Sequence, residues 1–344
     1  MTTKNRRIVV SRHGGPEVLQ LVDGDLPEPE TGTVRVRVLA AGVSAFDLIY
    51  RRWARLPGSP RVPFTLGEDI VGVVDKVGKG VVSLDPGQTV AGLTWALGVG
   101  GGYQDYVCLP ARDLVPVPTG LDPVEAVCLV VNYLTADQHL HQIAQIRRGE
   151  RLLVHGAAGG VGTALLQLGK LAGLEMYGTA SQNSHDLVAA LGATPIDYRT
   201  EDFVERIRNF TVDGVDVVVD TVGGGRHLWN SYRTLRKGGR LVWLGSAATN
   251  RKGLWIGPSS MLMVFMLRLI PDGKQVPTCP TLGPYAAAHP EWYRGTLTNL
   301  LDLLAAERIE PVVAERIPLA EAARAHELLE RGGHAGKIVL VTSE

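Results

Sequence analysis

The chain has 344 residues, 45% of them hydrophobic, which is enough for two domains with substantial cores. Its 35 basic and 35 acidic residues give a formal net charge of zero, which argues against a protein that binds nucleic acid through its charge. The cysteines Cys108, Cys128 and Cys279 are far apart, which argues against a disulfide scaffold or a cysteine-rich zinc lobe and indicates a reducing cytoplasm.

The amino-terminal segment has no continuous apolar core of the kind found in signal peptides. The most apolar later stretch, 254–270, is interrupted by Gly257-Pro258-Ser259-Ser260 and carries Arg268. A membrane-spanning helix needs roughly twenty apolar residues, so this stretch is too short and too broken. We expect a soluble, cytoplasmic protein without a membrane span.

Residues 6 to about 118 have a pattern typical of β-structure. Short β-branched or alternating runs are separated by turns such as Asp85-Pro86-Gly87. The expected strands are 8–11, 19–22, 34–40, 70–77, 89–93 and 103–109. Together they predict a small barrel-like or folded-sheet domain that is all β.

The composition then shifts toward helix. Asp122 is suited to cap a helix and Pro123 to occupy its first turn. The apolar stretch that follows runs through Asn132 and Thr135 and predicts a helix that ends near 147–149.

Residues 151–172 combine an apolar strand, a glycine turn and a helix with leucines at helical spacing. This order predicts a dinucleotide site, because the glycines admit a pyrophosphate and the helix N-terminus attracts it. Ala157 stands where the first glycine of this fingerprint usually occurs, and the alternative interpretation is an ordinary turn rich in small residues. The candidate cofactor residues here are Ala157, Gly159, Gly160, Val161 and Gly162.

The residue at the end of the next strand, 175–181, indicates which cofactor binds. A site that prefers NAD usually has Asp or Glu there to hold the ribose hydroxyls. The residue is Ser181, and without a carboxylate to repel a 2′-phosphate NADPH is favoured. The following Gln182-Asn183-Ser184 brings no Lys or Arg.

From residue 151 strands and helices alternate, which predicts an α/β fold with a doubly wound parallel sheet. The expected strands lie near 152–155, 175–180, 194–197, 215–220 and 240–245, and the expected helices near 160–172, 185–191, 201–209 and 226–236. The loops after 215–220 and 240–245 lie at carboxyl ends of strands, where such sheets bind ligands.

Past residue 250 this alternation stops. We expect a Met-rich apolar segment, a Pro-rich loop to 290, helices near 291–307 and 319–331, and a last strand over 337–341. The run 261–266 is adaptable apolar surface. It is interpreted as core or a dimer interface, with the lining of a bulky substrate's pocket as the alternative.

Several motifs occur in an order typical of one protein family. They are Ala41–Asp47, Pro63–Asp69 leading to Gly72-Val73-Val74, Pro86-Gly87, Asn132–Ala136, His155–Gly162 and Gly336–Val339. Over nearly its whole length the chain resembles the zinc-free quinone oxidoreductase branch of the medium-chain dehydrogenase/reductase superfamily. The resemblance implies a GroES-like β-barrel domain, 1–125 completed by 290–344, with a Rossmann domain, 126–289, inserted. It also implies a homodimer in which substrate and nicotinamide meet in a cleft.

The resemblance further assigns residues to the cofactor. Ser181 and Tyr198 fall at positions that hold the region of the adenosine 2′-phosphate, and Ser184 stands where family members often carry a lysine. The other candidates for the cofactor are Val222, Gly245, Ser246 and Lys337. For Lys337 the alternative is an ion pair with a surface acid.

The same resemblance locates the positions of the catalytic zinc ligands of related alcohol dehydrogenases. Where those enzymes have Cys, His and Cys, this chain has Ser44, Glu68 and Asn132, a poor set for zinc. We therefore predict no metal. Without this Lewis acid, reduction of a quinone or a conjugated C=C bond fits better than reduction of a simple ketone.

The candidate catalytic residues are Ser44, Asn132, Thr135 and Tyr50. Ser44 and Asn132 are suited to hold a substrate oxygen or part of the cofactor, or else to satisfy local backbone. Thr135 matches a family threonine near the nicotinamide but is equally suited to cap a helix. Tyr50 is a possible proton source, although its position departs from the usual one. Asp47 matches the family pattern, and a salt bridge to a neighbouring arginine is as plausible for it as catalysis.

Four arginines, Arg51, Arg52, Arg55 and Arg61, occur close together. An acidic or polyphenolic substrate would suit them, but a solvated surface is the favoured interpretation.

Three functions are compatible with these features. The first is an NADPH-dependent, zinc-independent reductase whose partner is a small electrophile, a quinone or an enone. The second is a reductase that tailors an aromatic or polyketide intermediate. The third is a nucleotide-binding interaction protein with little catalysis, because no obligatory acid–base pair is visible.

Overall fold

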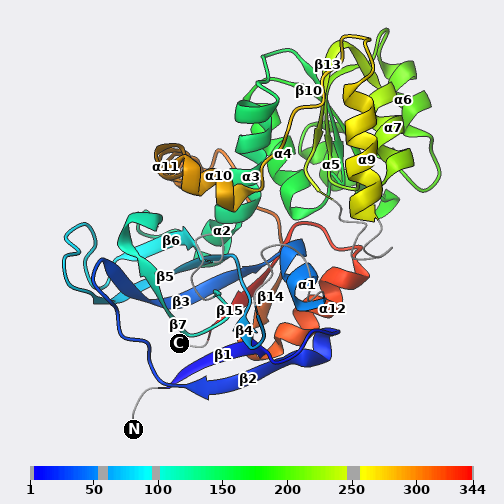
Figure 1. Ribbon diagram of the computed structural model, residues 1–344. Coiled ribbons are helices and arrows are strands. Elements are labelled where there is room, and N and C mark those ends of the chain that lie inside the picture. Colours follow the sequence, from blue (N-terminus) through cyan, green and yellow to red (C-terminus); the bar gives the residue numbers. More distant parts are fainter. Residues whose placement is uncertain (1–3, 53–60, 95–100, 246–255, 343–344) are drawn as a thin grey trace. The chain divides into compact units, whose positions relative to one another are not determined.

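The computed structural model describes residues 4–52, 61–94, 101–245 and 256–342. The chain forms two compact units (Figure 1). The first unit comprises Met1–Leu134, Leu282–Gly332 and Lys337–Glu344, and the second comprises Thr135–Thr281 and Gly333–Gly336. Each unit is described by itself below.

The first unit contains two β-sheets, as the β-rich amino-terminal pattern predicts. A seven-stranded sheet has the order β14-β15-β3-β5-β6-β8, with β7 paired to β3, and a three-stranded sheet has the order β2-β1-β4. The strands are β1 Asn5–Val10, β2 Leu19–Gly24, β3 Thr33–Val43, β4 Phe64–Thr65, β5 Asp69–Val77, β6 Thr89–Leu93, β7 Tyr106–Pro110, β8 Leu114–Pro116, β14 Val313–Pro318 and β15 Lys337–Val341.

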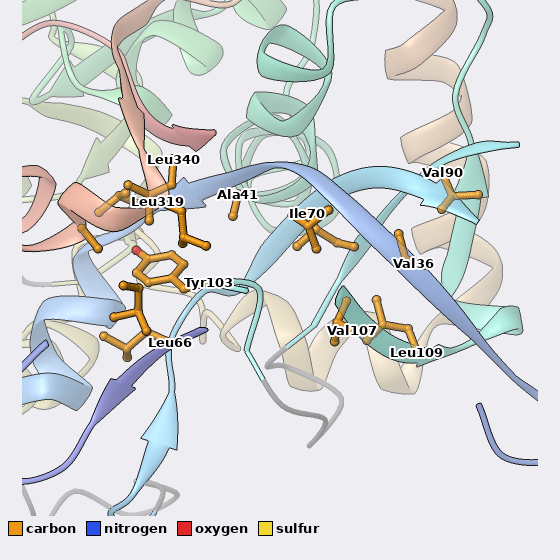
Figure 2. Packing of buried hydrophobic residues seen from close by; sticks show 14 of the residues in the cluster. Val36, Ala41, Leu66, Ile70, Val90, Tyr103, Val107, Leu109, Leu319 and Leu340 are labelled. Carbon is orange, nitrogen blue, oxygen red and sulfur yellow. The ribbon is translucent and has the colours of Figure 1, made fainter. Parts of the chain in front are cut away.

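Alternation of side chains along these strands builds the core of the first unit. On β3, Val34, Val36 and Val38 are fully buried while the arginines between them are partly exposed, which is the period of two expected of a strand with one covered face. Figure 2 shows Val36 of β3, Ile70 of β5 and Leu340 of β15 in one cluster. The carboxyl-terminal strand is therefore part of the amino-terminal core.

The expectation that residues 6–118 are all β is wrong, because Ala45–Arg52 forms the helix α1 and two short 3₁₀ turns also lie in this range. The helix expected at Asp122 is present as α2, Pro123–Cys128, whose first turn is capped by the Asp122 carboxylate accepting from the Val124 N–H at 2.9 Å. It continues into the π-helix η4, Leu129–Tyr133. The other helices of this unit are α10 Leu282–Ala288, α11 Pro290–Ala305, α12 Ala322–Arg331 and the short turns η1 Pro16–Val18, η3 Ala111–Asp113 and η7 Leu319–Glu321.

The second unit has the doubly wound parallel sheet predicted from the alternation of strands and helices. Its five strands have the order β11-β10-β9-β12-β13, and each neighbouring pair is parallel. All six residues of β12 are buried, as expected of a strand covered on both faces. Figure 1 shows α4 and α7 on opposite sides of this sheet.

The elements of the second unit follow the expected ranges closely up to residue 243. The strands are β9 Arg151–His155, β10 Glu175–Ala180, β11 Ala193–Asp197, β12 Val215–Asp220 and β13 Leu235–Trp243. The helices are α3 Leu134–Asp137, η5 Gln138–Ile143, α4 Gly160–Leu171, η6 Gln182–Ser184, α5 His185–Ala190, α6 Phe203–Phe210, α7 Gly225–Arg233 and α9 Ile256–Arg268.

The region 250–290 is more helical than expected, since it contains α9 and α10. Val264 and Leu267 of α9 are buried, but Met261, Leu262, Phe265 and Met266 are each more than half exposed in the single chain. This face of the helix is therefore not part of the core of the single chain, and its roles as a dimer interface or as a pocket lining stay predictions. None of the helices in the described parts of the chain is long and apolar enough to cross a membrane.

Candidate functional site

The predicted dinucleotide loop lies between β9 and α4 in the second unit. Gly156 makes the turn with φ of +71°, and Gly159 occupies the position before the first turn of α4. The first amide groups of a helix have no acceptor within the helix, so those at Gly160, Val161 and Gly162 face the loop at the positive end of the helix dipole. This arrangement is suited to bind a pyrophosphate.

Close packing explains why this loop consists of small residues. A Cβ atom on Gly162 would overlap the Gly156 carbonyl oxygen and the Ala157 backbone. Ala157 is fully buried, and its N–H donates to the Thr179 carbonyl at 3.0 Å. The loop therefore has a fixed backbone that a larger side chain at residue 162 would displace.

The residues expected around the 2′-phosphate lie together at the ends of β10 and β11. Ser181 directly follows β10, and the Tyr198 N–H donates to the Ala180 carbonyl at 3.3 Å. Tyr198 is half exposed, whereas Ser184 is 9% exposed. Arg199, which the sequence analysis did not single out, places its guanidinium 5.7 Å from the centre of the Tyr198 ring. A cation is thus present one residue after Tyr198.

A buried hydrogen-bond network lies at the ends of β9, β10 and β12. The His155 ring contacts the Thr179 hydroxyl at 3.0 Å and the Ser231 hydroxyl at 3.1 Å. Ser231 donates to Asp220 at 2.7 Å, and the other oxygen of Asp220 accepts from the Val222 N–H at 2.9 Å. The network holds the backbone of the loop that contains Val222. The valine-rich sequence of β12 does not by itself indicate this network.

This network also contains the one group of potential metal ligands found in the described residues, His155, Asp220 and His227, whose ligand atoms lie within 4.8 Å of one another. Burial, followed by the proximity of His227, lowers the pKa of His155 to about 3. Burial opposes ionisation of Asp220, but the two histidines and its hydrogen bonds outweigh it and lower the pKa of that carboxyl. Hydrogen bonds already engage His155 and Asp220, so the proximity of these three side chains does not require a metal ion. That the protein binds no metal stays a prediction.

Two further cofactor candidates follow β13. Gly245 accepts a hydrogen bond at its carbonyl from the Trp243 indole N–H at 2.6 Å. Ser246 lies outside the described residues.

In the first unit, Ser44 and Glu68 form a hydrogen-bonded pair. The Ser44 hydroxyl donates to a Glu68 carboxylate oxygen at 2.7 Å, and both residues are partly exposed. Ser44 immediately precedes α1, and Glu68 immediately precedes β5, so the ends of two elements fix the pair. Burial, followed by the charge of Asp47, raises the pKa of Glu68 to about 8.

Asp47 is buried beneath this pair. It accepts from the Ser44 N–H at 2.7 Å, the Gly67 N–H at 3.0 Å and the Tyr103 hydroxyl at 3.1 Å. The expected salt bridge from Asp47 to an arginine is therefore wrong. Asp47 has a structural role instead, because it holds the backbone at Ser44 and Gly67. Burial is the largest cause that raises the pKa of Asp47 to about 6.

Lys337 does not pair with a surface acid. Its side chain is 2% exposed, and the ammonium donates to fully buried Asp69 at 2.6 Å. Burial disfavours the charge, but Asp69 more than compensates and raises the pKa of Lys337. Gly42 makes room for this ion pair, because a Cβ atom there would overlap the lysine side chain.

The remaining catalytic candidates lie on two helical segments, Asn132 and Thr135 on η4 and α3, and Tyr50 on α1. Asn132 is 7% exposed on η4 in the first unit, and Thr135 is 7% exposed in the second. Thr135 lies inside α3, which continues directly from η4, so its alternative role as a helix cap is wrong. The Tyr50 ring stacks on Phe46 with centres 6.1 Å apart on α1.

The arginine-rich segment is only partly a solvated surface. Arg51 is fully buried and pairs with Glu330 of α12, while its guanidinium contacts the His326 ring at 2.9 Å. Arg52 also pairs with Glu330, at 3.0 Å. Arg61 is exposed, and Arg55 lies outside the described residues.

Two family profiles match the chain. The Alcohol dehydrogenase GroES-like domain matches residues 30–119, and the Zinc-binding dehydrogenase profile matches residues 191–340. A quinone oxidoreductase from Pseudomonas aeruginosa is 34% identical over 98% of this chain and 99% of its own length. The synaptic vesicle membrane protein VAT-1 homolog of Danio rerio is 31% identical over 98% of this chain and 70% of its own length.

The chain is also similar to solved structures of quinone oxidoreductases and related proteins. The quinone oxidoreductase of Pseudomonas syringae has a TM-score of 0.85 and 31% identity, covering 98% of this chain and 99% of that one. A mycobacterial protein complexed with NADPH has a TM-score of 0.84 and 29% identity, with the same coverage of both chains.

Proposed function

The chain belongs to the medium-chain dehydrogenase/reductase family, in its quinone oxidoreductase branch, and on this premise we propose that it reduces quinones or other α,β-unsaturated carbonyl compounds with NADPH and without zinc. When bound, the nicotinamide supplies the hydride. The protein's own residues bind the nucleotide, orient the acceptor and stabilise the charge that develops on its oxygen.

The fit of NADPH rests on the second unit. The loop Ala157–Gly162 is suited to the pyrophosphate, because its glycines leave space that a Cβ atom would fill. Ser181 and Tyr198 lie side by side at the ends of β10 and β11 with Arg199 beside them, which suits a 2′-phosphate better than a bare ribose. We propose that Ser184, Val222, Gly245, Ser246 and Lys337 complete the cofactor site.

Zinc does not fit the corresponding residues of the first unit. Catalytic zinc is held by thiolate and imidazole groups, with carboxylate as a further ligand. The three positions here offer a hydroxyl, a carboxylate and an amide, and the Ser44 hydroxyl is already bonded to Glu68 at 2.7 Å. No step of the proposed reaction therefore uses a metal.

This Ser44–Glu68 pair is the observation that carries the proposal. A simple ketone needs strong polarisation of its carbonyl before it accepts a hydride, whereas a quinone or enone is already electron-poor at the accepting carbon. Hydrogen-bond donors then suffice for the oxyanion. We propose that Ser44 and Asn132 supply them, with Thr135 and Tyr50 as further catalytic residues.

The test is NADPH oxidation by the purified protein with a panel of quinones and enones, followed by the loss of nicotinamide absorbance. We expect turnover with several simple acceptors and little oxidation without an acceptor. Turnover only with a complex aromatic acceptor would support a tailoring reductase instead. Tight NADPH binding with no turnover across the panel would contradict the proposal and favour a nucleotide-binding interaction protein.

We further propose that the protein works in the cytoplasm as a homodimer. The proposed domain limits are 1–125, completed by 290–344, for the GroES-like domain and 126–289 for the Rossmann domain. Light scattering of the purified protein measures the mass of the assembly directly, and a monomer at micromolar concentration would contradict the dimer.

A further inference from the structure

The environment of Glu68 contains more acids than bases. The carboxylates of Asp47 on α1 and Asp69 on β5 lie close to it, and Lys337 on β15 is the cation that faces them. The other titratable groups around this cluster are the Tyr103 hydroxyl, His326 of α12 behind it and the Cys128 thiol of α2. Burial raises the pKa of Cys128 to about 12 and of Tyr103 above its ordinary value, and it lowers that of His326, so all three are neutral near pH 7.

Hydrogen bonds show which of the three acids is least supported as an anion. Asp47 accepts three donors, from Ser44, Gly67 and Tyr103. Asp69 has the Lys337 ammonium at 2.6 Å. Glu68 accepts, among the described side chains, the Ser44 hydroxyl. A carboxylate with few donors beside two other carboxylates is the one that retains a proton.

The position of Glu68 makes that proton available. Glu68 and Ser44 are partly exposed, whereas Asp47 and Asp69 are buried. When Glu68 carries a proton, its O–H donates to the Ser44 oxygen over the same 2.7 Å, and the Ser44 hydroxyl rotates so that its own hydrogen is free to donate to the substrate oxygen. A neutral acid in a partly exposed residue, joined to a hydroxyl, is a chemically competent proton donor.

We propose that Glu68 stores the proton that completes reduction of the acceptor and delivers it through the Ser44 hydroxyl. This inference rests on the proposed function. After a hydride has added to carbon, the electron pair displaced from the conjugated system resides on the substrate oxygen. That oxygen takes the Ser44 proton as Ser44 takes the Glu68 proton, and the Glu68 carboxylate then regains one from water. One hydride and one proton are thus added, and the acceptor is reduced by two electrons.

The arrangement accounts for the departure from the zinc-ligand pattern at residue 68. A histidine at this position would serve a metal, whereas a glutamate beside Asp47 acts as an acid. Ser44 is then the catalytic residue that touches the substrate oxygen, and Glu68 acts through it.

The test compares Glu68→Gln with Glu28→Gln, which makes the same substitution at an exposed surface ion pair with Lys76. The first measurement uses the protein alone. Difference infrared spectra between about pH 6 and about pH 10 should show a protonated carboxylic acid that ionises near pH 8. We expect this band to be lost in Glu68→Gln and retained in Glu28→Gln and in Ser44→Ala.

The second measurement is the single-turnover rate of acceptor reduction across the same pH range. In the wild type and Glu28→Gln we expect the rate to fall above about pH 8, by roughly tenfold per pH unit, as Glu68 loses its proton. Glu68→Gln should be slower by on the order of 10²-fold below that pH, and its rate should not change across it. Ser44→Ala should be slowed similarly while keeping the infrared band.

Each other outcome has a defined meaning. Normal turnover with an unchanged pH dependence in Glu68→Gln would overturn the proton path alone, as would an infrared band that persists in that variant. If the wild type reduces none of the quinones or enones, the proposed function fails, and the proton path fails with it.

Discussion

At the scale of single residues, the dinucleotide loop shows how side-chain volume determines which glycines of the motif can be replaced by a larger residue. Ala157 replaces a usual glycine, and its methyl group is accommodated because residue 178 opposite is glycine, where a Cβ atom would lie 2.7 Å from that of Ala157. Gly162 has no such compensation, since its Cβ atom would overlap backbone. Backbone cannot yield as a side chain can, so the loop accepts alanine at residue 157 but not at residue 162.

Arg199 is the residue we expect to determine preference for the phosphorylated cofactor. Its guanidinium lies against the ring of Tyr198, next to Ser181, in a region with no lysine at residue 184. Arg199→Ala should weaken NADPH binding by about 1.5–3 kcal/mol, the range for hydrogen bonds to charged groups. NADH binding should change by less than about 0.5 kcal/mol, because NADH lacks the 2′-phosphate.

Calorimetric titration with both cofactors measures this difference. Arg208→Ala, which removes an exposed arginine from the last turn of α6, is the matched control and should leave both affinities unchanged. Equal loss of NADPH and NADH affinity in Arg199→Ala would show that Arg199 acts on the fold of the site and not on the phosphate.

The polar residues also show where sequence reasoning stops. Ser44 and Glu68 are identified by their motifs, but nothing local indicates that they bond to each other 24 positions apart. For Asp47 a salt bridge to a neighbouring arginine was one expectation, yet Arg51 pairs with Glu330 and contacts His326 instead. Partners that are distant in sequence are set by the tertiary fold, so motif position alone does not predict these contacts.

At the scale of elements, the strands and helices of the second unit were predictable because each has a strong local pattern. Buried parallel strands are continuous apolar runs, and the helices between them have clear turns at both ends. Three helices were missed, α1, α9 and α10, and the first two lack those signals. The described part of α1 has eight residues, and the described part of α9, Ile256–Arg268, includes Pro258. The Gly-Pro-Ser-Ser sequence that resembled a break is therefore helical.

The two faces of α9 give a direct test of this assignment. Val264 is 8% exposed and packs in the core of the second unit, whereas Phe265 is 58% exposed. Val264→Lys should destabilise the protein by about 3–5 kcal/mol, because it buries an unpaired charge. Phe265→Lys should change the free energy of unfolding by less than about 0.5 kcal/mol.

Urea unfolding followed by circular dichroism measures both variants under identical conditions. The two substitutions are adjacent and introduce the same side chain, so each is the other's control. Comparable destabilisation by both would mean that the apolar face of α9 carrying Phe265 is covered in solution.

At the scale of the whole molecule, the first unit is assembled from distant parts of the chain. The last strand, β15, pairs antiparallel with β3, placing Ile338 opposite Val43 and Leu340 opposite Ala41. Local patterns predict β15 as a strand but not its partner, because its partner β3 is separated from it in sequence by the whole second unit. The family resemblance predicts that the carboxyl-terminal segment completes the first unit, whereas alternation and composition alone do not.

The buried Lys337–Asp69 ion pair fixes this closure, since it joins residues 268 positions apart in the space left by Gly42. Lys337→Met should destabilise the protein by about 3–5 kcal/mol, because it leaves the Asp69 carboxylate buried without its cation. Combining it with Asp69→Leu should recover most of that loss, since a packed apolar pair needs no desolvation of charge. Lys76→Met, at a surface pair on the same strand β5 as Asp69, should cost less than about 1 kcal/mol. Urea unfolding of the wild type and the three variants measures these differences. If Lys337→Met is no less stable than Lys76→Met, closure depends on strand pairing and not on the ion pair.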